Sequence, residues 1–276
     1  MPELPEVETI KNFLANSITG LCLQEVLVLN SKLRFDVPES LERVVGSKIT
    51  QVKRRAKYLA IFFDNDDVLL AHLGMSGSML IYPNDYQAVK HDHILWFFDQ
   101  DICLVYNDPR KFGFIDLTTK QDLHKHKALI NLGVEPLEEE LSLEVLCDLL
   151  KAKLPVKNFL MNNAFIVGIG NIYASEILFR SKIHPLTLAS SLNQQQALVL
   201  LTNIKLVLQE AIISGGSTIR NFAHPSGERG NFASDFCVYG RHDKQCCICG
   251  QIIQKLVLAG RSTFFCPSCQ PDTCGA

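Results

Sequence analysis

Four cysteines near the end of the sequence limit most strongly what this chain can fold into. Cys246 and Cys249 form one Cys-x-x-Cys pair, and after sixteen residues Cys266 and Cys269 form a second. Two such pairs supply four thiolates, which suit a tetrahedral zinc ion; a chance set of free thiols is the alternative. We predict one structural Zn²⁺ per chain, with no part in catalysis, because four sulfur ligands leave no open position.

The segment between the two cysteine pairs predicts a β-hairpin. Residues 252–258 and 262–265 are runs of strand length, and Arg261 lies near the turn between them. Six cysteines stand outside the ligand pattern: Cys22, Cys103, Cys147, Cys237, Cys247 and Cys274. The first three lie in apolar surroundings, so we interpret them as core residues.

Length and composition predict a globular protein of two domains. The chain has 276 residues, of which 47% are hydrophobic and 20% charged. No apolar run approaches about 18 residues, and the N-terminus lacks a basic and then apolar leader. We therefore expect a cytoplasmic protein with neither a membrane span nor a signal peptide.

Charge is distributed unevenly along the chain. The formal net charge is −2, which argues against a protein that coats nucleic acid by bulk attraction. Basic residues nevertheless cluster at 53–58 and at 110–111, while residues 135–148 are acid-rich. A local basic surface is therefore compatible with the acidic total.

The N-terminal half has the pattern of a helix followed by strands. Val7, Ile10 and Leu14 recur at helical spacing, and Gly20 ends the pattern. Short apolar runs then follow at 21–29, 48–52, 58–63, 68–73, 94–98, 102–106 and 114–117. Regular short strands with tight turns predict an antiparallel sandwich or barrel.

The pattern becomes helical beyond residues 131–141, which have the composition of a linker. Helical spacing recurs over 143–151, 156–161, 171–179 and 194–213. Gly168 and Gly170 precede the third of these helices, and backbone N–H groups at such a start bind phosphate well. Residues 214–236 have little periodicity, and loops of that length are either functional or lack order.

The first residues offer a nucleophile next to an acid. Removal of Met1 would leave Pro2 with a secondary amine and Glu3 as the next residue. An α-amino group titrates near pH ~8, so it needs little pKa tuning to attack. Its addition to a sugar aldehyde carbon gives an iminium ion, a permanent electron sink. The alternative is a helix start, in which Pro5 and the acids favour the first turn.

Two loops combine apolar and cationic side chains with glycine. Met75 lies in residues 72–77, and Arg110 and Phe112 lie in residues 108–113. Such side chains suit insertion into a base stack in place of an extruded base; the alternative places Met and Phe in the core. Lys57 ends a basic run, for which a solvated edge strand is the alternative.

Together and in order, these motifs resemble bacterial formamidopyrimidine-DNA glycosylase, in the formamidopyrimidine and endonuclease VIII family. The segments that carry the resemblance are 2–9, 54–58, 72–77, 108–113, 168–176, 238–241 and 246–269. The resemblance therefore runs through essentially the whole chain.

The resemblance implies an α+β fold of two domains. An N-terminal helix and antiparallel β-sandwich would form the catalytic domain at 1–130, followed by a linker at 131–141. A helical domain with a helix-two-turns-helix and a lesion loop would occupy 142–236, and a zinc-finger β-hairpin 237–276. A monomer would hold damaged double-stranded DNA in the cleft between the domains, without a membrane, in the nucleoid.

The resemblance also implies catalytic residues. Pro2 would be the Schiff-base nucleophile on the sugar C1′, and Glu3 the acid/base that assists ring opening. Lys57 would donate a proton in the strand-cleaving elimination. Arg261 would contact the phosphates and assist the second elimination.

DNA-binding residues are implied in the same way. Those that would fill the gap left by the flipped nucleotide are Met75, Arg110 and Phe112. Those that would bind backbone phosphate are His91, Lys153 and Asn171, with Lys151 as the alternative to Lys153. Further matches to the family are Glu6, Glu176, and the residues that begin the lesion loop, Ser217 and Thr218.

The implied activity is that of a bifunctional DNA glycosylase and AP lyase. It would excise oxidised purines, such as 8-oxoguanine and formamidopyrimidines, and cleave the strand by β,δ-elimination. The related endonuclease VIII, which prefers oxidised pyrimidines, is the alternative enzyme; Leu4 favours the purine branch, because the sister branch typically has Gly there. A non-catalytic binder of damaged DNA is the other alternative, against which Pro2, Glu3 and Lys57 together argue.

Overall fold

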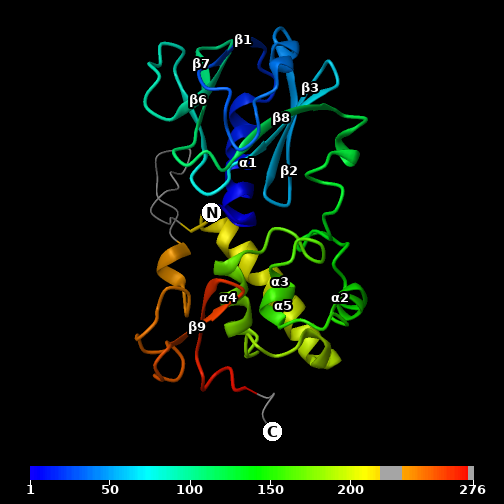
Figure 1. Ribbon diagram of the computed structural model, residues 1–276, viewed down its shortest axis with the longest axis vertical. Coiled ribbons are helices and arrows are strands. Elements are labelled where there is room, and N and C mark those ends of the chain that lie inside the picture. Colours follow the sequence, from blue (N-terminus) through cyan, green and yellow to red (C-terminus); the bar gives the residue numbers. More distant parts are fainter. Residues whose placement is uncertain (218–231, 273–276) are drawn as a thin grey trace. The chain divides into compact units, whose positions relative to one another are not determined.

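Residues 1–217 and 232–272 are described by the computed structural model of the chain. Two units make up the fold (Figure 1). Unit 1 consists of Met1–Asn131 and Gly215–Gly230, and unit 2 of Leu132–Ser214 and Asn231–Ala276. Thr218, Cys274 and most of the predicted loop at 214–236 lie outside the described residues.

Helix α1 (Leu4–Ile18) begins unit 1 and anchors the start of the chain. Pro5 lies in its first turn, where the missing N–H has no helical partner to lose. The Glu6 carboxylate accepts a hydrogen bond of 2.8 Å from the Glu3 N–H, one of the unpaired donors of the helix start. Gly20 follows the helix with φ +89°, a conformation that favours glycine.

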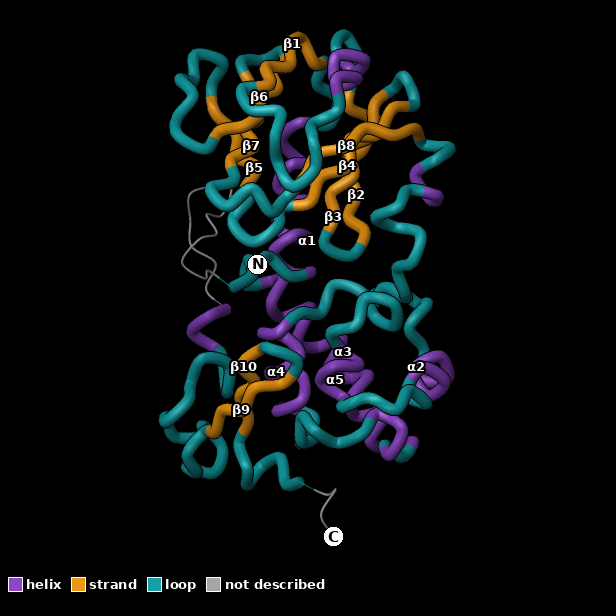
Figure 2. The backbone as a smooth tube through the Cα atoms, in the orientation of Figure 1, coloured by secondary structure: helices purple, strands orange, loops and turns teal. Residues whose placement is uncertain are grey.

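Two antiparallel sheets make up most of the rest of unit 1 (Figure 2). In spatial order, the first contains β1 (Leu23–Val28), β6 (Asp92–Phe98), β7 (Ile102–Asn107) and β5 (Ser78–Tyr82). The second contains β2 (Ile49–Arg55), β3 (Tyr58–Phe63), β4 (Asp67–His72) and β8 (Phe114–Thr119). Short 3₁₀ helices are η1 (Glu39–Val44) and η2 (Leu123–Lys125).

The two sheets and α1 share one hydrophobic core. Ile10 and Leu14 of α1 belong to it together with Trp96 of the first sheet and Leu59 of the second. The predicted helix and sandwich are thus confirmed, and the barrel is excluded. Strand β5 was not predicted, although residues 79–82 are an apolar run of strand length directly after the glycine-rich loop; it pairs with β7.

Unit 2 is built on helices around a second core. They are α2 (Leu143–Leu149), α3 (Val156–Leu160), α4 (Asn171–Arg180) and α5 (Gln194–Ile213), with the short 3₁₀ helices η3 (Ala189–Ser191) and η4 (Phe232–Asp235). Asn193 caps α5, since its side chain accepts a hydrogen bond from the Gln196 N–H while Gln196 bonds back to the Asn193 N–H.

By length and composition alone, helix α5 is long and apolar enough to cross a membrane. Polar residues interrupt its sequence, so it contains no long uninterrupted apolar run. Leu200, Ile204 and Leu208 of this helix are buried in the core of unit 2. Core helices of globular proteins pass the same test, so it is weak evidence for a span. No other helix in the described ranges 1–217 and 232–272 passes it.

Strands β9 (Gln254–Leu258) and β10 (Arg261–Phe265) form the predicted hairpin in unit 2. Ala259 and Gly260 make its two-residue turn with φ of +48° and +73°. Positive φ at both positions matches the twist of the strands. Arg261 follows the turn at once and is exposed.

Candidate active site and metal centre

The start of the chain is buried and joined to the base of the predicted lesion loop. Pro2 and Glu3 are buried, although Met1 is exposed. The second oxygen of the Glu6 carboxylate, Oε1, accepts hydrogen bonds from the N–H and the hydroxyl of Ser217, at 2.8 and 2.9 Å. Glu6 therefore holds Glu3, the residue after Pro2, in a fixed position relative to Ser217, where the loop begins.

Charged groups gather around the terminal amine. Burial lowers the pKa of the Met1 amino group, while the Glu3 and Glu6 carboxylates raise it and the Lys57 ammonium lowers it further. The pKa falls as a net result, so an amine at this point loses its proton more readily than one in water. Once Met1 is removed, the terminal amine belongs to Pro2.

Lys57 lies in the tight turn between β2 and β3. Ala56, the first residue of that turn, has φ +53°, and Lys57 is only 7% exposed. Its neighbour Arg54 donates a hydrogen bond of 2.6 Å from Nε to Glu8 on α1, and the Arg54 side chain is 6% exposed. The basic run at 53–58 is therefore partly internal, which the solvated-edge alternative did not anticipate.

Met75 and Phe112 project from two neighbouring loops of unit 1. They are 39% and 43% exposed, so neither belongs to the core. The Arg110 guanidinium carbon lies 4.7 Å from the centre of the Phe112 ring, a cation–π contact. A Cβ on Gly74 would meet the Phe112 carbonyl carbon at 2.4 Å, so only glycine allows the two loops to approach so closely.

His72 ends β4 beside these loops. Its Nδ1 accepts a hydrogen bond of 3.1 Å from the Gly74 N–H, and its ring stacks on Phe114. Burial lowers the pKa of His72 to about 4, and the nearby Lys57 charge lowers it as well. His72 is therefore neutral at pH 7.

Replacement of His72 by Asn is expected to reduce the loss of folding stability that the wild type shows as the pH falls below 6.5. In the wild type, unfolded His72 binds a proton below pH 6.5 while the folded residue resists protonation down to about pH 4. Unit 1 should thus lose stability, by at most about 3 kcal/mol, as the pH falls through this window. Trp96, the single tryptophan, reports unfolding in urea at pH 7 and pH 4.5. An equal loss of stability between pH 7 and pH 4.5 in His72→Asn and in the wild type would contradict a lowered pKa of His72.

In unit 2, a buried lysine connects the start of α4 to the hairpin. The Nζ of Lys157, which is 1% exposed, donates hydrogen bonds of 2.6 Å to Asn171 Oδ1 and to Thr263 Oγ1. The Asn171 amide also donates to the Ser262 carbonyl at 2.9 Å. An amide nitrogen carries two N–H groups, so Asn171 can still donate to a phosphate. These bonds hold Asn171 next to the strand that carries Arg261.

The other predicted phosphate contacts are placed as follows. His91 directly precedes β6 with φ +76°. Lys151 and Lys153 are both exposed, but Lys151 forms an ion pair of 2.7 Å with Asp148. Within residues 1–217 and 232–272, Lys153 has no salt-bridge partner.

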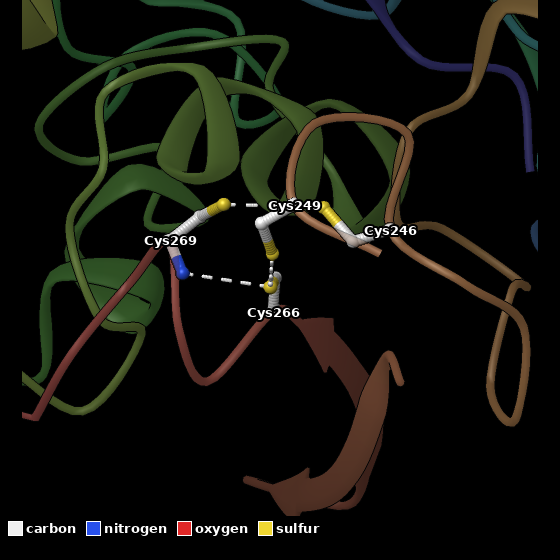
Figure 3. Close-up of side chains that lie close together, drawn as sticks. All are labelled: Cys246, Cys249, Cys266 and Cys269. Carbon is white, nitrogen blue, oxygen red and sulfur yellow. Dashed lines mark hydrogen bonds between the residues drawn. The ribbon is translucent and has the colours of Figure 1, made fainter. Parts of the chain in front are cut away.

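The four predicted zinc ligands come together in unit 2. Figure 3 shows Cys246 and Cys249, which precede β9, gathered with Cys266 and Cys269, which follow β10. All four sulfur atoms lie within 4.8 Å of one another, and two pairs are 3.9 and 3.5 Å apart. Ligands of a tetrahedral zinc–thiolate site stand roughly 3.8 Å apart, so the residues fit the metal.

The thiols of this cluster differ in acidity. The Gln251 N–H lowers the pKa of Cys249 to about 7, whereas burial raises the pKa of Cys266 and of Cys269. Zinc binds thiolates, so it must displace the protons that Cys266 and Cys269 hold. Zinc uptake by the free protein should therefore release protons.

Family models match the chain in three consecutive segments. The formamidopyrimidine-DNA glycosylase N-terminal domain matches residues 1–115, and the H2TH domain of the same glycosylase matches residues 132–223. The zinc finger found in FPG and IleRS matches residues 244–271. The chain belongs to the formamidopyrimidine-DNA glycosylase family.

Relatives of this family match from end to end. Formamidopyrimidine-DNA glycosylase of Wolbachia sp. subsp. Brugia malayi is 43% identical over 272 residues, which is 98% of this chain and 100% of the relative. Two solved structures of Lactococcus lactis Fpg, one with abasic-site DNA and one with FAPY-dG DNA, each have a TM-score of 0.90. They are 33% and 32% identical and cover 98% of this chain and 100% of theirs.

Membership in the glycosylase family accounts for the fold and the metal cluster. The chain has the N-terminal domain, the H2TH domain and the FPG zinc finger, and four cysteines are positioned to bind one zinc ion. The family is one of DNA glycosylases, so the predicted resemblance is confirmed.

Glu176, which the resemblance implied only as a match to the family, makes contacts that the sequence did not reveal. Glu176 is 2% exposed, and its carboxylate accepts the backbone N–H groups of Cys237, Val238 and Tyr239 at 2.8–3.0 Å. Burial raises the pKa of Glu176, although these N–H groups oppose the shift. Glu176 therefore holds the segment that leads into the finger. A charged residue inside an apolar helical pattern was the available signal.

Proposed function

We propose that this chain is a bifunctional DNA glycosylase and AP lyase, which excises oxidised purines from duplex DNA and cleaves the strand by β,δ-elimination. The observation that carries the proposal is the environment of the terminal amine: Glu3 is buried beside Pro2, and the charges of Glu6, Lys57 and Arg110 act on the amine. A poised nucleophile with acids and a lysine in reach suits this chemistry. The DNA in the Lactococcus lactis complexes agrees with it.

The first half of the reaction exchanges the base for the enzyme. The Pro2 nitrogen attacks C1′, the bond from C1′ to the base breaks, and the base leaves with the electron pair and takes up the proton that the nitrogen loses. Glu3 gives a proton to the ring oxygen as the C1′–O4′ bond breaks, so an iminium ion joins Pro2 to the opened sugar. The nitrogen of this ion holds no proton, and the positive charge therefore persists.

The second half cleaves the strand. Loss of the C2′ proton to a base turns the iminium into an enamine, whose electrons expel the 3′ phosphate as Lys57 donates a proton. Loss of a further sugar proton expels the 5′ phosphate, and Arg261 stabilises the charge that develops there. Water then hydrolyses the iminium ion, which gives the carbonyl of the sugar remnant and restores the Pro2 amine.

Two sets of residues contact the DNA. The residues that take the place of the extruded nucleotide are Met75, Arg110 and Phe112. The residues that bind backbone phosphates are His91, Lys153, Asn171 and Arg261. Zinc, when bound by its four cysteines, supplies folding energy to the hairpin that carries Arg261. The protein acts as a monomer on damaged double-stranded DNA in the nucleoid, without a membrane.

Excision of 8-oxoguanine opposite cytosine is expected to be about 10-fold faster or more than excision of thymine glycol from the same duplex. The reason is that a pocket built to bond a two-ring purine leaves polar groups unpaired when a pyrimidine enters. Single-turnover excision by protein whose mass establishes removal of Met1 measures this ratio.

Two results would contradict the proposal in different ways. Faster release of thymine glycol would identify an endonuclease VIII activity. Binding to both duplexes without excision or a borohydride-trapped adduct would identify a non-catalytic binder of damaged DNA.

A further inference from the structure

The carboxylate of Asp108 lies between the two loops that carry Met75 and Phe112, and the reaction described above does not use it. Asp108 is completely buried, at 0% exposure. We propose that Asp108 is the positioning residue that holds Met75, Arg110 and Phe112 together as one rigid wedge for base extrusion. The inference rests on the proposed function, which gives these three side chains their task.

One oxygen of Asp108 joins the two loops directly. Its Oδ1 accepts a hydrogen bond of 2.6 Å from the hydroxyl of Ser76, the residue after Met75, and one of 3.2 Å from the Arg110 N–H. The Arg110 N–H also donates to the Ser76 hydroxyl oxygen at 3.1 Å. The three groups form a closed triangle, so neither loop can move without breaking a bond to the other.

The other oxygen fixes the far side of the second loop. Asp108 Oδ2 accepts hydrogen bonds of 2.8 Å from the Gly113 N–H and 3.4 Å from the Tyr106 hydroxyl. Arg110 and Gly113 stand on either side of Phe112, so the carboxylate holds the loop at both ends of the exposed ring. A Cβ on Gly113 would meet the Tyr106 hydroxyl at 2.1 Å, which keeps this packing specific to glycine.

The backbone of Asp108 extends the same network to a predicted phosphate contact. Its N–H donates to the His91 carbonyl at 3.1 Å, and its carbonyl accepts the Lys111 N–H at 3.2 Å. The same carbonyl lies 2.8 Å from His93 Nε2. His91 and Lys111 both have positive φ, at +76° and +55°. Such backbone persists where surrounding bonds determine it, and Asp108 supplies one to each.

A carboxylate at position 108 is well suited to hold the wedge residues in place. Insertion into a base stack must repay the unstacking of bases, so side chains that are already held in place lose less freedom on insertion. A buried carboxylate needs several donors, and each hydrogen bond to a charged acceptor is stronger than a neutral one. Asn at position 108 would replace one acceptor oxygen by an N–H donor facing other donors, and would loosen the loops without changing volume.

The test compares Asp108→Asn with Asp67→Asn in the otherwise complete, zinc-bound protein. Asp67 is a matched control, because it is also a buried carboxylate of unit 1, and it pairs with Arg43 at 2.7 Å away from the wedge. Each protein is assayed on duplexes with 8-oxoguanine and with a preformed abasic site, which needs no base extruded. Trp96 fluorescence verifies folding of unit 1.

Asp108→Asn is expected to lower 8-oxoguanine excision by ~10- to 100-fold relative to abasic-site cleavage, because a displaced wedge acts on extrusion. Asp67→Asn should leave this ratio unchanged. Ser76→Ala removes only the hydroxyl bridge, so it should lower the ratio of 8-oxoguanine excision to abasic-site cleavage by less. It also provides a test if Asp108→Asn does not fold. A 2-aminopurine base next to the lesion should brighten less with both wedge variants than with wild type.

Equal losses on both duplexes, or no loss, would overturn the positioning role while leaving the proposed function intact. A wild-type protein that cleaves neither duplex would overturn the proposed function, and this inference with it. The two failures are therefore distinguished by the wild-type arm.

Discussion

Pro2→Gly is expected to reduce the borohydride-trapped adduct with lesion DNA by ~1,000-fold or more. The glycine variant still ends in an amine, but that amine is primary. Its imine is neutral unless a proton is added, so it is a weaker electron sink than the iminium of proline. Glycine also lacks the ring that fixes the backbone at the start of α1. Reduction of the adduct, gel analysis and mass spectrometry of the linked peptide measure the yield and locate the nitrogen.

The matched control leaves Pro2 in place and blocks it. A protein that retains an N-terminal tag has the same units and the same zinc cluster, yet its Pro2 nitrogen is an amide. It should bind lesion DNA and form no adduct, and removal of the tag to expose Pro2 should restore trapping. A second control, Pro5→Ala, changes a proline of the same helix without touching the amine. An undiminished adduct in Pro2→Gly would place the nucleophile elsewhere, with Lys57 the next candidate by position.

The fold was largely predictable because its elements have local periods. The apolar positions of α1 recur at helical spacing, and seven of the eight strands of the sandwich appear as short apolar runs with turns between them. Strand β5 has the same kind of signal, an apolar run at 79–82, but the run was not assigned because it follows directly on the glycine-rich loop at 72–77. Helix α5 was predicted as a helix, but not as one apolar enough to cross a membrane. Polar residues interrupt its sequence, whereas its apolar face is continuous.

The candidate site was only partly predictable, because a charged residue looks the same in sequence whether it is buried or solvated. The cysteine pairs were identified from spacing, since metal ligands have a fixed geometry. Arg54 was assigned to a basic surface, although its partner Glu8 lies 46 residues away. Lys157 and Asp108 were missed for the same reason: their partners come from distant segments that only the folded chain brings close.

Cys249→Ser is expected to lose the bound zinc and to weaken DNA binding, whereas Cys247→Ser should do neither. Cys249 belongs to the sulfur cluster, and its pKa of about 7 makes it the thiol most ready to lose its proton. Zinc in comparable fingers contributes an apparent ~10–16 kcal/mol to folding, so loss of one of four ligands should release the hairpin that carries Arg261. Zinc content per chain, measured by mass spectrometry under native conditions, tests the first effect.

The second effect is read from the salt dependence of binding to abasic-site DNA. If the hairpin supplies a phosphate contact, its release should lower the slope of log affinity against log salt by about 1 and the affinity by about 10-fold. Unit 1 should remain folded, as judged by Trp96, because its core is separate from that of the finger. Cys247 is exposed and adjacent to a ligand, so its substitution controls for local disturbance. Equal zinc loss in Cys249→Ser and Cys247→Ser would show that local disturbance, and not the loss of a ligand, removes the metal. It would contradict the assignment of the four cysteines as zinc ligands.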